Sequence, residues 1–137
     1  MQGIAVLAAL SLVAAADAPP KDDHRFNLSC QGDVITLALG RPTETRRWSN
    51  VYVVDGRAKK WCGGDCKVAS KLLNLSADSL TFFNDPKPNG HDTAAVDLNT
   101  GEYQGVLEVD DAAGKVFILV RTTGVCTRAP FTGLPRR

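Results

Sequence analysis

The sequence predicts an all-β fold: a small antiparallel β-barrel or a two-sheet sandwich of about seven to nine short strands, with two disulfides. Apolar and polar residues alternate with a period of two in several stretches, which is typical of strands with one buried face. Turn-forming residues separate these stretches at short intervals. The chain has 137 residues, which suits one domain, and four cysteines, an even number.

The beginning of the chain has the features of an export signal. The run from Gly3 to Ala16 has no charge, is rich in Ala, Leu and Val, and is too short to span a bilayer as a helix. We expect residues 1–16 to be a signal peptide, with cleavage after Ala16 favoured over cleavage after Ala18. The alternative is a buried N-terminal helix. The polar, proline-rich residues 17–25 are predicted to be a flexible leader, and the mature protein is predicted to be periplasmic or secreted, without a transmembrane segment.

Three alternating stretches lie in the predicted single β domain, residues 26–127. They are “FNLSC”, “VITLAL” and “SLTFF”, and the “QGD” between the first two is predicted to be a turn. The residues expected to share one face are Phe26, Leu28 and Cys30 in the first strand, Ile35, Leu37 and Leu39 in the second, and Leu80 and Phe82 in the third.

Aspartate and glycine patterns predict the hairpin turns between later strands. “VDGR” (54–57) is expected to form a type I′ turn, which needs positive φ angles. “VDLNTGEY” (96–103) and “VDDAAGKV” (109–116) share a Val-Asp pair, three residues and a glycine. We expect Asp97 and Asp110 to accept backbone N–H bonds across these turns, which gives a meander of antiparallel strands.

Three segments near the middle and end of the chain complete the prediction. The run from Val116 to Val120 is apolar on both faces, so we expect it in the middle of a sheet or closing a barrel. Residues 67–76 fit a strand or a short helix; we favour a helical turn or loop, then a strand from about Ser79 to Phe83. Residues 128–137 are predicted to be a C-terminal tail in which Phe131 docks.

The cysteines of an exported chain are expected to form disulfides. Cys62 and Cys66 flank two glycines in “WCGGDC”, where the backbone can turn tightly, so we favour this pair among the three pairings. Cys30 and Cys126 are then the second pair. The spacing suits neither a zinc site nor a thioredoxin-type C-x-x-C motif; a labile, regulatory Cys62–Cys66 bond is the functional alternative.

The sequence predicts no catalytic residue, no metal ligand and no cofactor. His24 lies in the leader, and His91 stands beside Asp92 in a Pro/Gly-rich loop without a G-x-S-x-G motif. The stretch Asp97–Gly101 resembles the start of a calcium-binding EF-hand loop, but Glu102 occupies the position that must be glycine. We therefore expect a protein that is not an enzyme.

Positive charge is concentrated in residues 41–71. The net charge of the chain is +1, which gives no drive toward nucleic acid, but this stretch has eight basic and three acidic residues, hence +5 against −4 elsewhere. Two Trp residues next to paired cations suit an anionic ligand. The candidate ligand-binding residues are Arg46, Arg47, Trp48, Arg57, Lys59, Lys60 and Trp61. The alternative is that both tryptophans point inward and the cations form an ordinary solvated face.

Three longer motifs resemble those of a known set of proteins. “FNLSCQG”, “VYVVDGRAKKWCGGDC” and “AAVDLNTGEY” are similar to motifs in small uncharacterised exported proteins of Alphaproteobacteria. These share an F-x-L-x-C-x-G opening, a hydrophobic-Asp strand followed by W-C and a later strand that ends in a Thr-Gly turn. The chain departs from them at Asp97, where many members have Arg. The resemblance implies an exported bacterial β-protein and no particular activity.

Three functions are compatible with these features. The first is a non-catalytic binding module of the bacterial envelope that uses the basic region for an anionic polymer or a protein partner. The second is a secreted inhibitor of a hydrolase, with the “CGGDC” loop as its wedge. The third is a small hydrolase that uses His91 and Asp92. The oligomeric state is not predicted.

Overall fold

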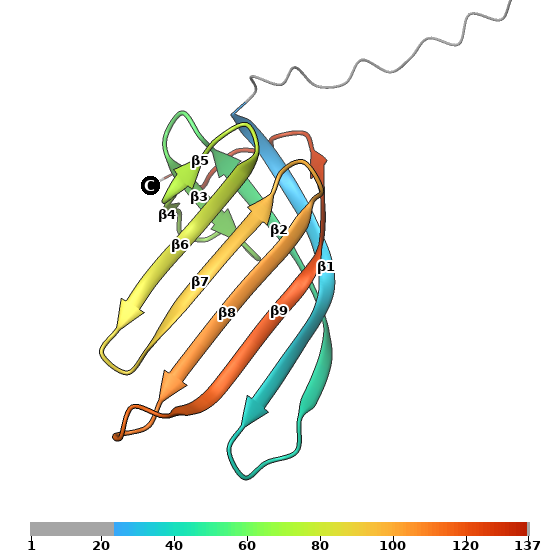
Figure 1. Ribbon diagram of the computed structural model, residues 1–137. Helices are drawn as coiled ribbons and strands as arrows, with labels where there is room; N and C mark the ends of the chain where they lie inside the picture. The colour runs from blue at the N-terminus through green and yellow to red at the C-terminus, as the bar shows by residue number, and fades with distance from the viewer. Residues whose placement is uncertain (1–23, 137) are drawn as a thin grey trace, which may run out of the picture.

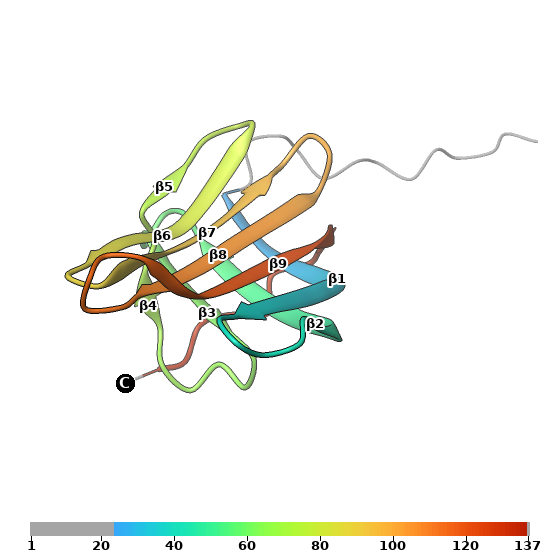
Figure 2. The same ribbon diagram turned by 60° about the horizontal axis from the view of Figure 1, so that its bottom comes forward.

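The computed structural model describes residues 24–136, which form a single antiparallel sheet of nine strands (Figure 1). The strand order across the sheet is β4-β3-β2-β1-β9-β8-β7-β6-β5. The strands are β1 (Arg25–Ala38), β2 (Glu44–Asp55), β3 (Lys60–Gly63), β4 (Ser70–Lys71), β5 (Asn74–Leu75), β6 (Ser79–Lys87), β7 (Gly90–Asp97), β8 (Glu102–Asp110) and β9 (Val116–Ala129). The all-β prediction is confirmed, and the architecture is a curled half-barrel (Figure 2).

The predicted signal peptide, residues 1–16, and residues 17–23 of the predicted leader lie outside the described residues. Arg25, at the end of that leader, already belongs to β1. No helix in residues 24–136 is long and apolar enough to span a membrane.

The packed core lies inside the curl, at one end of the long strands. Its buried side chains include Phe26, Leu28, Tyr52, Val54, Leu80, Phe82, Val96 and Tyr103. Here the segment 70–75 joins the two edges of the sheet, because the N–H of Leu72 donates to the carbonyl of Lys59 (2.9 Å) and that of Leu73 to Thr81 (3.2 Å). We call this the closed end, and the opposite end, with the β1–β2, β6–β7 and β8–β9 hairpins, the open end (Figure 1).

The “QGD” stretch is not a turn, which corrects the expectation of two strands in this region. β1 pairs with both β2 and β9 through this stretch without a shift in register. Gly32 lies opposite Gly124 of β9, and a Cβ atom at Gly32 would lie 1.9 Å from the carbonyl oxygen of Thr123. The glycine therefore permits two backbones to approach closely, rather than a reversal of the chain.

The two facing glycines also bring two aromatic rings together. Trp48 of β2 is the register partner of Gly32, and Tyr103 of β8 is the partner of Gly124. The ring centroids of Trp48 and Tyr103 are 4.7 Å apart. Because neither glycine has a side chain, rings from strands that are not neighbours can meet inside the curl.

The continuity of β1 places its two apolar runs on opposite faces of the sheet. Phe26, Leu28 and Cys30 face the core, whereas Ile35 and Leu37 occupy the alternate positions and face outward. The two runs were predicted to lie on separate strands, so their location on opposite faces of a single strand was not expected. The open end therefore has apolar side chains on its outer surface.

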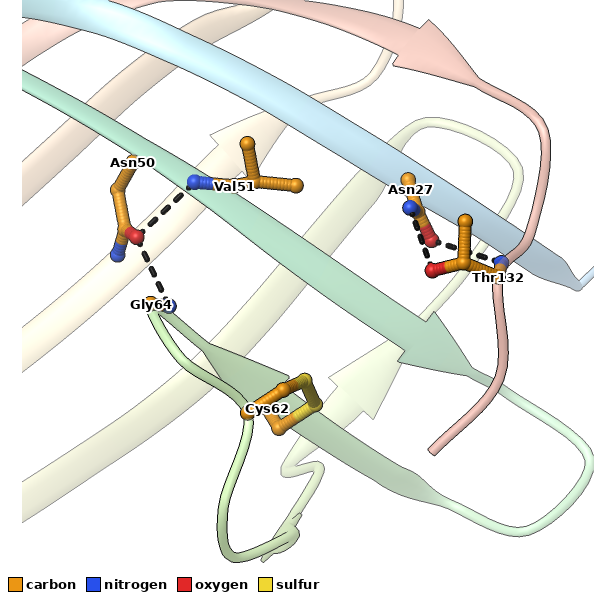
Figure 3. The surroundings of a disulfide bond; sticks show 7 residues. Asn27, Asn50, Val51, Cys62, Gly64 and Thr132 are labelled. Atoms are coloured by element: carbon orange, nitrogen blue, oxygen red, sulfur yellow. Dashed lines mark hydrogen bonds between the residues drawn. A yellow bond between two sulfur atoms is a disulfide. The ribbon is translucent and has the colours of Figure 1, made fainter. Parts of the chain in front are cut away.

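Both predicted disulfides are present, and residues 24–136 contain no free cysteine. Cys30 and Cys126 are direct register partners on β1 and β9, so this buried bridge joins strands that are 96 residues apart in sequence. Cys62 and Cys66 close a short loop after β3 (Figure 3).

β9, with its run of residues apolar on both faces, is fifth among nine strands, which confirms the central position predicted for it.

Aspartate side chains shape the hairpin turns, but not all as expected. Asp97 accepts two backbone N–H bonds across the β7–β8 turn (2.8 and 3.1 Å), as predicted. In the β8–β9 turn Asp111, and not Asp110, accepts two such bonds (both 2.9 Å), because Asp110 is still paired in β8. The β2–β3 connection has its positive φ at Lys59 (53°), so the predicted Asp-Gly type I′ turn is wrong.

Residues 67–76 form no helix, so the helical turn is wrong, whereas the loop given as its alternative makes up most of the segment. They contain the two-residue strands β4 and β5 on either side of Leu72. Leu72 is buried and Val68 is exposed, so the apolar residues do not share a helical face. β6 begins at Ser79 as predicted but continues past Phe83 to Lys87.

The residues after β9 lie against the outer face of the sheet at the closed end. Asn27 donates from Nδ2 to Oγ1 of Thr132 (2.9 Å) and accepts at Oδ1 from the N–H of Thr132 (3.3 Å), as Figure 3 shows. The guanidinium of Arg25 lies 5.6 Å from the centroid of the Phe131 ring. The tail is thus fixed along β1.

Candidate functional site

The structure divides the seven predicted ligand-binding residues between the two ends of β2. Arg46 and Arg47 lie near its beginning, whereas Arg57, Lys59 and Lys60 lie beyond its end. The eight residue steps from Arg47 to Asp55 correspond to roughly 27 Å of extended strand. The cations therefore do not form one continuous patch.

Both tryptophans pack against the core instead of forming an exposed platform with the cations. The ring of Trp48 contacts Tyr103, and that of Trp61 lies 4.8 Å from the ring of Phe82 between centroids. Arg46 and Arg47 occupy successive positions of β2 and so point to opposite faces, and Arg47 pairs with Asp33 (3.6 Å). Arg47 and Trp48 line a hollow of about 460 Å³ together with Gln31, Gly32, Ser49 and Val125, and Arg47 is its one cationic side chain.

Cations do gather at the closed end, beside the edge of the sheet. Six exposed side chains make up this basic group, namely Arg57, Lys59, Lys60, Lys67, Lys71 and Arg136. Lys60 and Lys71 are direct register partners on β3 and β4, an arrangement that is unfavourable unless an anion offsets it. Asp65 pairs with Lys67 (3.3 Å), but Asp55 is buried and already bonded to Arg25 and to the β2–β3 turn.

A hollow of about 440 Å³ lies among part of the basic group, between the segment 58–69 and the C-terminal tail. We call it the basic hollow. Lys60, Lys67 and Arg136 supply its charged lining, and Val68, Leu134 and Pro135 supply apolar walls. A negatively charged group entering it would meet three cations from three separate segments.

The loop that forms one side of the basic hollow is fixed by a disulfide and by one amide. The Cys62–Cys66 bridge closes it, and Oδ1 of Asn50 accepts from the N–H groups of Gly64 and Val51 (2.9 Å each), as drawn in Figure 3. Gly64 and Cys66 both have positive φ angles (65° and 55°). The other side of the hollow is fixed by the Asn27–Thr132 bonds.

The aromatic interior behind this edge carries a paired set of hydroxyl groups. Tyr52 and Tyr103 share a buried hydrogen bond between their hydroxyls (3.3 Å). Burial, and secondarily that bond, raise the pKa of Tyr103 far above the ordinary tyrosine value. The Tyr103 hydroxyl is therefore protonated at neutral pH.

The residues of the hydrolase hypothesis do not converge. His91 and Asp92 are consecutive in β7, so their side chains point to opposite faces of the sheet. Nδ1 of His91 lies 2.9 Å from a carboxylate oxygen of Glu108 on the neighbouring strand. Burial raises the pKa of Asp92, and Asp85 opposite it acts in the same direction, whereas Lys87 lowers it.

No family model, curated protein or solved structure matches this chain. The resemblance to exported alphaproteobacterial proteins therefore stays a prediction. Among residues 24–136, no group of three or more His, Cys, Asp or Glu side chains could hold a metal ion.

Sequence reasoning missed part of the site that the structure assembles. Arg136, Leu134 and Pro135 lie in the segment that was predicted to be only a tail. Lys67 was counted in the basic stretch but was not among the candidate ligand-binding residues. The closing “PRR” of the chain was the one visible signal, and it gave no indication of which surface the tail would reach.

Proposed function

We propose that this protein is a non-catalytic, exported binding module of the bacterial envelope and that it binds an anionic partner at the basic group. The observation that carries the proposal is the basic hollow, in which Lys60, Lys67 and Arg136 converge from a strand, a loop and the tail. Two disulfides support a protein that works outside the reducing cytosol, in the periplasm or as a secreted protein.

The arrangement favours binding over catalysis. Exposed lysines and arginines attract a polyanion through charge without activating a nucleophile. The disulfide and the bonds of Asn50 and Asn27 fix the walls of the hollow before a ligand arrives, which lowers the entropic cost of binding.

Retention on an alginate resin, an anionic polysaccharide, tests this function. We expect the mature protein to bind at low salt and to elute as salt screens the charges. The triple variant Lys60→Gln, Lys67→Gln, Arg136→Gln should bind roughly tenfold more weakly, since each exposed ion pair contributes about 0.2–1 kcal/mol.

The matched control is Arg46→Gln, Arg47→Gln, Arg121→Gln, which removes the same charge at exposed positions away from the basic hollow. This control should keep most of the retention. Equal loss in both triple variants would mean that only net charge matters, and the assigned site would then be wrong.

A second candidate function, inhibition of a hydrolase, is favoured by the stiffness of the “CGGDC” loop. Asp65 projects from a loop closed by the Cys62–Cys66 bridge and held by Asn50. This candidate predicts a tight one-to-one complex with a hydrolase that Asp65→Ala disrupts. The triple variant Lys60→Gln, Lys67→Gln, Arg136→Gln, which we call the charge variant, should leave that complex largely intact, which separates the two functions.

A further inference from the structure

A second hollow, of about 370 Å³, lies on the other side of the same edge segment. We call it the aromatic hollow. The partly exposed rings of Trp61 and Phe83 line it, Asn50 and Ser70 add polar groups, and the core rings of Tyr52, Phe82 and Tyr103, at most 6% exposed, complete its lining. A concave site with aromatic walls and a few fixed polar groups is the usual form of a small-ligand site.

One glycine sets the close packing at the edge of this hollow. Gly63 ends β3 opposite Tyr52, and a Cβ atom there would lie 3.1 Å from carbons of the Tyr52 ring. Tyr52 is only 6% exposed, so the main chain of Gly63 already lies against its ring, and a side chain at this position would have to displace the ring.

The polar groups around the aromatic hollow have hydrogen-bonding capacity to spare. Nε1 of Trp61 is a buried donor for which the described residues supply no acceptor. Oδ1 of Asn50 is used by two backbone N–H groups, which leaves its NH₂ group as a donor. Buried donors are normally paired, so an unpaired indole N–H on a residue that lines the hollow is a reason to consider a ligand.

These features fit a sugar ring better than a purely apolar molecule. A pyranose has apolar C–H faces that pack on aromatic rings and hydroxyls that pair with amide, indole and hydroxyl groups. The aromatic hollow and the basic hollow share Val68 in their linings and flank the segment 60–70. A polymer of acidic sugars could therefore place a ring in one hollow and a negative charge in the other.

We propose that the aromatic hollow is a sugar-ring subsite and that the anionic partner is an acidic polysaccharide. The assignment rests on the proposed function for its charge component, and on the aromatic hollow alone for its ring component. The two components can fail separately, which allows a test that distinguishes them.

The experiment titrates the full mature protein with an alginate tetrasaccharide and, in parallel, with its methyl ester, while tryptophan fluorescence is recorded. The ester has the same rings but no charge. We expect both to change the fluorescence, the ester about tenfold more weakly and without dependence on salt.

Two variants address the aromatic hollow. Phe83→Ala removes a half-buried ring and should weaken both ligands about tenfold, whereas Phe117→Ala, at the exposed open end, should weaken neither. Because Phe83→Ala also loosens the core, Ser70→Tyr serves as a second variant, which fills the hollow from an exposed position. Circular dichroism confirms that each variant is folded.

The outcomes separate the two components. If Phe83→Ala and Ser70→Tyr bind the acidic tetrasaccharide as well as the unmodified protein, while the charge variant does not, the sugar-ring subsite is wrong and the anion-binding function stands. If the ester binds and Ser70→Tyr blocks it, but alginate shows no salt-sensitive retention, the subsite stands as a neutral-sugar site and the proposed function is wrong. If neither ligand binds, both proposals are overturned.

Discussion

The closed and open ends of the sheet contain similar residues and differ in what covers them. Leu28 and Leu37 belong to the same strand, yet their exposed fractions are 1% and 42%, because Leu28 faces the core at the closed end and Leu37 lies on the outer face at the open end. At the closed end, the segment 70–75 bridges the two edges and the side chains of both edges meet inside. At the open end, no strand pairing among the described residues joins β2 to β6.

The comparison shows that an apolar stretch in a sheet is buried only where the curl closes over it. β9 is fifth of the nine strands, but its residues Val116 and Phe117 are still exposed. Pairing on both edges satisfies the backbone, whereas burial of a side chain needs a second layer above the face. Stability should therefore be concentrated at the closed end, and four experiments measure this imbalance.

The largest difference should come from the two disulfides. Replacing Cys30 and Cys126 with alanine should lower the free energy of unfolding by about 4–5 kcal/mol, because the bridge closes a loop of nearly the whole domain. The matched replacement of Cys62 and Cys66 should cost only about 2 kcal/mol. Urea denaturation followed by circular dichroism measures both losses of stability. Equal losses would contradict the explanation that each bridge stabilises the fold by restricting the unfolded chain.

A pair of phenylalanines compares a buried position at the closed end with an exposed one at the open end. Phe82→Ala, at a residue 1% exposed, should cost about 3–5 kcal/mol because it leaves a cavity in the aromatic core. Phe117→Ala, at a residue 44% exposed, should cost less than about 1 kcal/mol. The same denaturation assay decides the matter, and a large loss for Phe117→Ala would show that the open end is covered in solution.

The close approach of β1 and β9 can be tested at Gly32. The Cβ atom of Gly32→Ala would lie within 3 Å of three backbone atoms, so the strands must separate, at a cost of about 1–3 kcal/mol. The control is Gly40→Ala in the open-end β1–β2 hairpin, where nothing lies within 4 Å and only the positive φ angle (74°) opposes the substitution. Thermal melts should place the Gly32 variant lower, and the reverse order would refute the close-approach explanation.

The smallest effect concerns Asp92, toward the open end of the inner face. Its pKa is raised in the folded protein, mainly by burial, so the fold disfavours its ionised form. The stabilising contribution is present below the unfolded pKa of about 3.9 and is lost as pH rises through the folded value. Asp92→Asn should therefore be slightly more stable than the unmodified protein at pH 7, and this gain should vanish near pH 3.

Several features could be predicted from the sequence because they depend on neighbours in the chain. Alternation in “SLTFF” identified Leu80 and Phe82 as core residues, and both are buried. The aspartate and glycine pattern after β7 identified the turn at Asp97. The two glycines of “WCGGDC” indicated the Cys62–Cys66 bridge, and elimination then gave Cys30–Cys126.

Other features were decided by contacts between distant segments. Gly32 suggested a turn locally, but its role is set by Gly124, which lies 92 positions later in the chain. The basic hollow needs Arg136 of the tail beside Lys60 and Lys67, and the tail reaches it because Asn27 holds Thr132. The alternation of apolar and polar residues indicates which residues share a face of the sheet. It does not indicate which part of that face is covered when the sheet curls. Burial and the site depend on that closure, so only the tertiary structure could determine them.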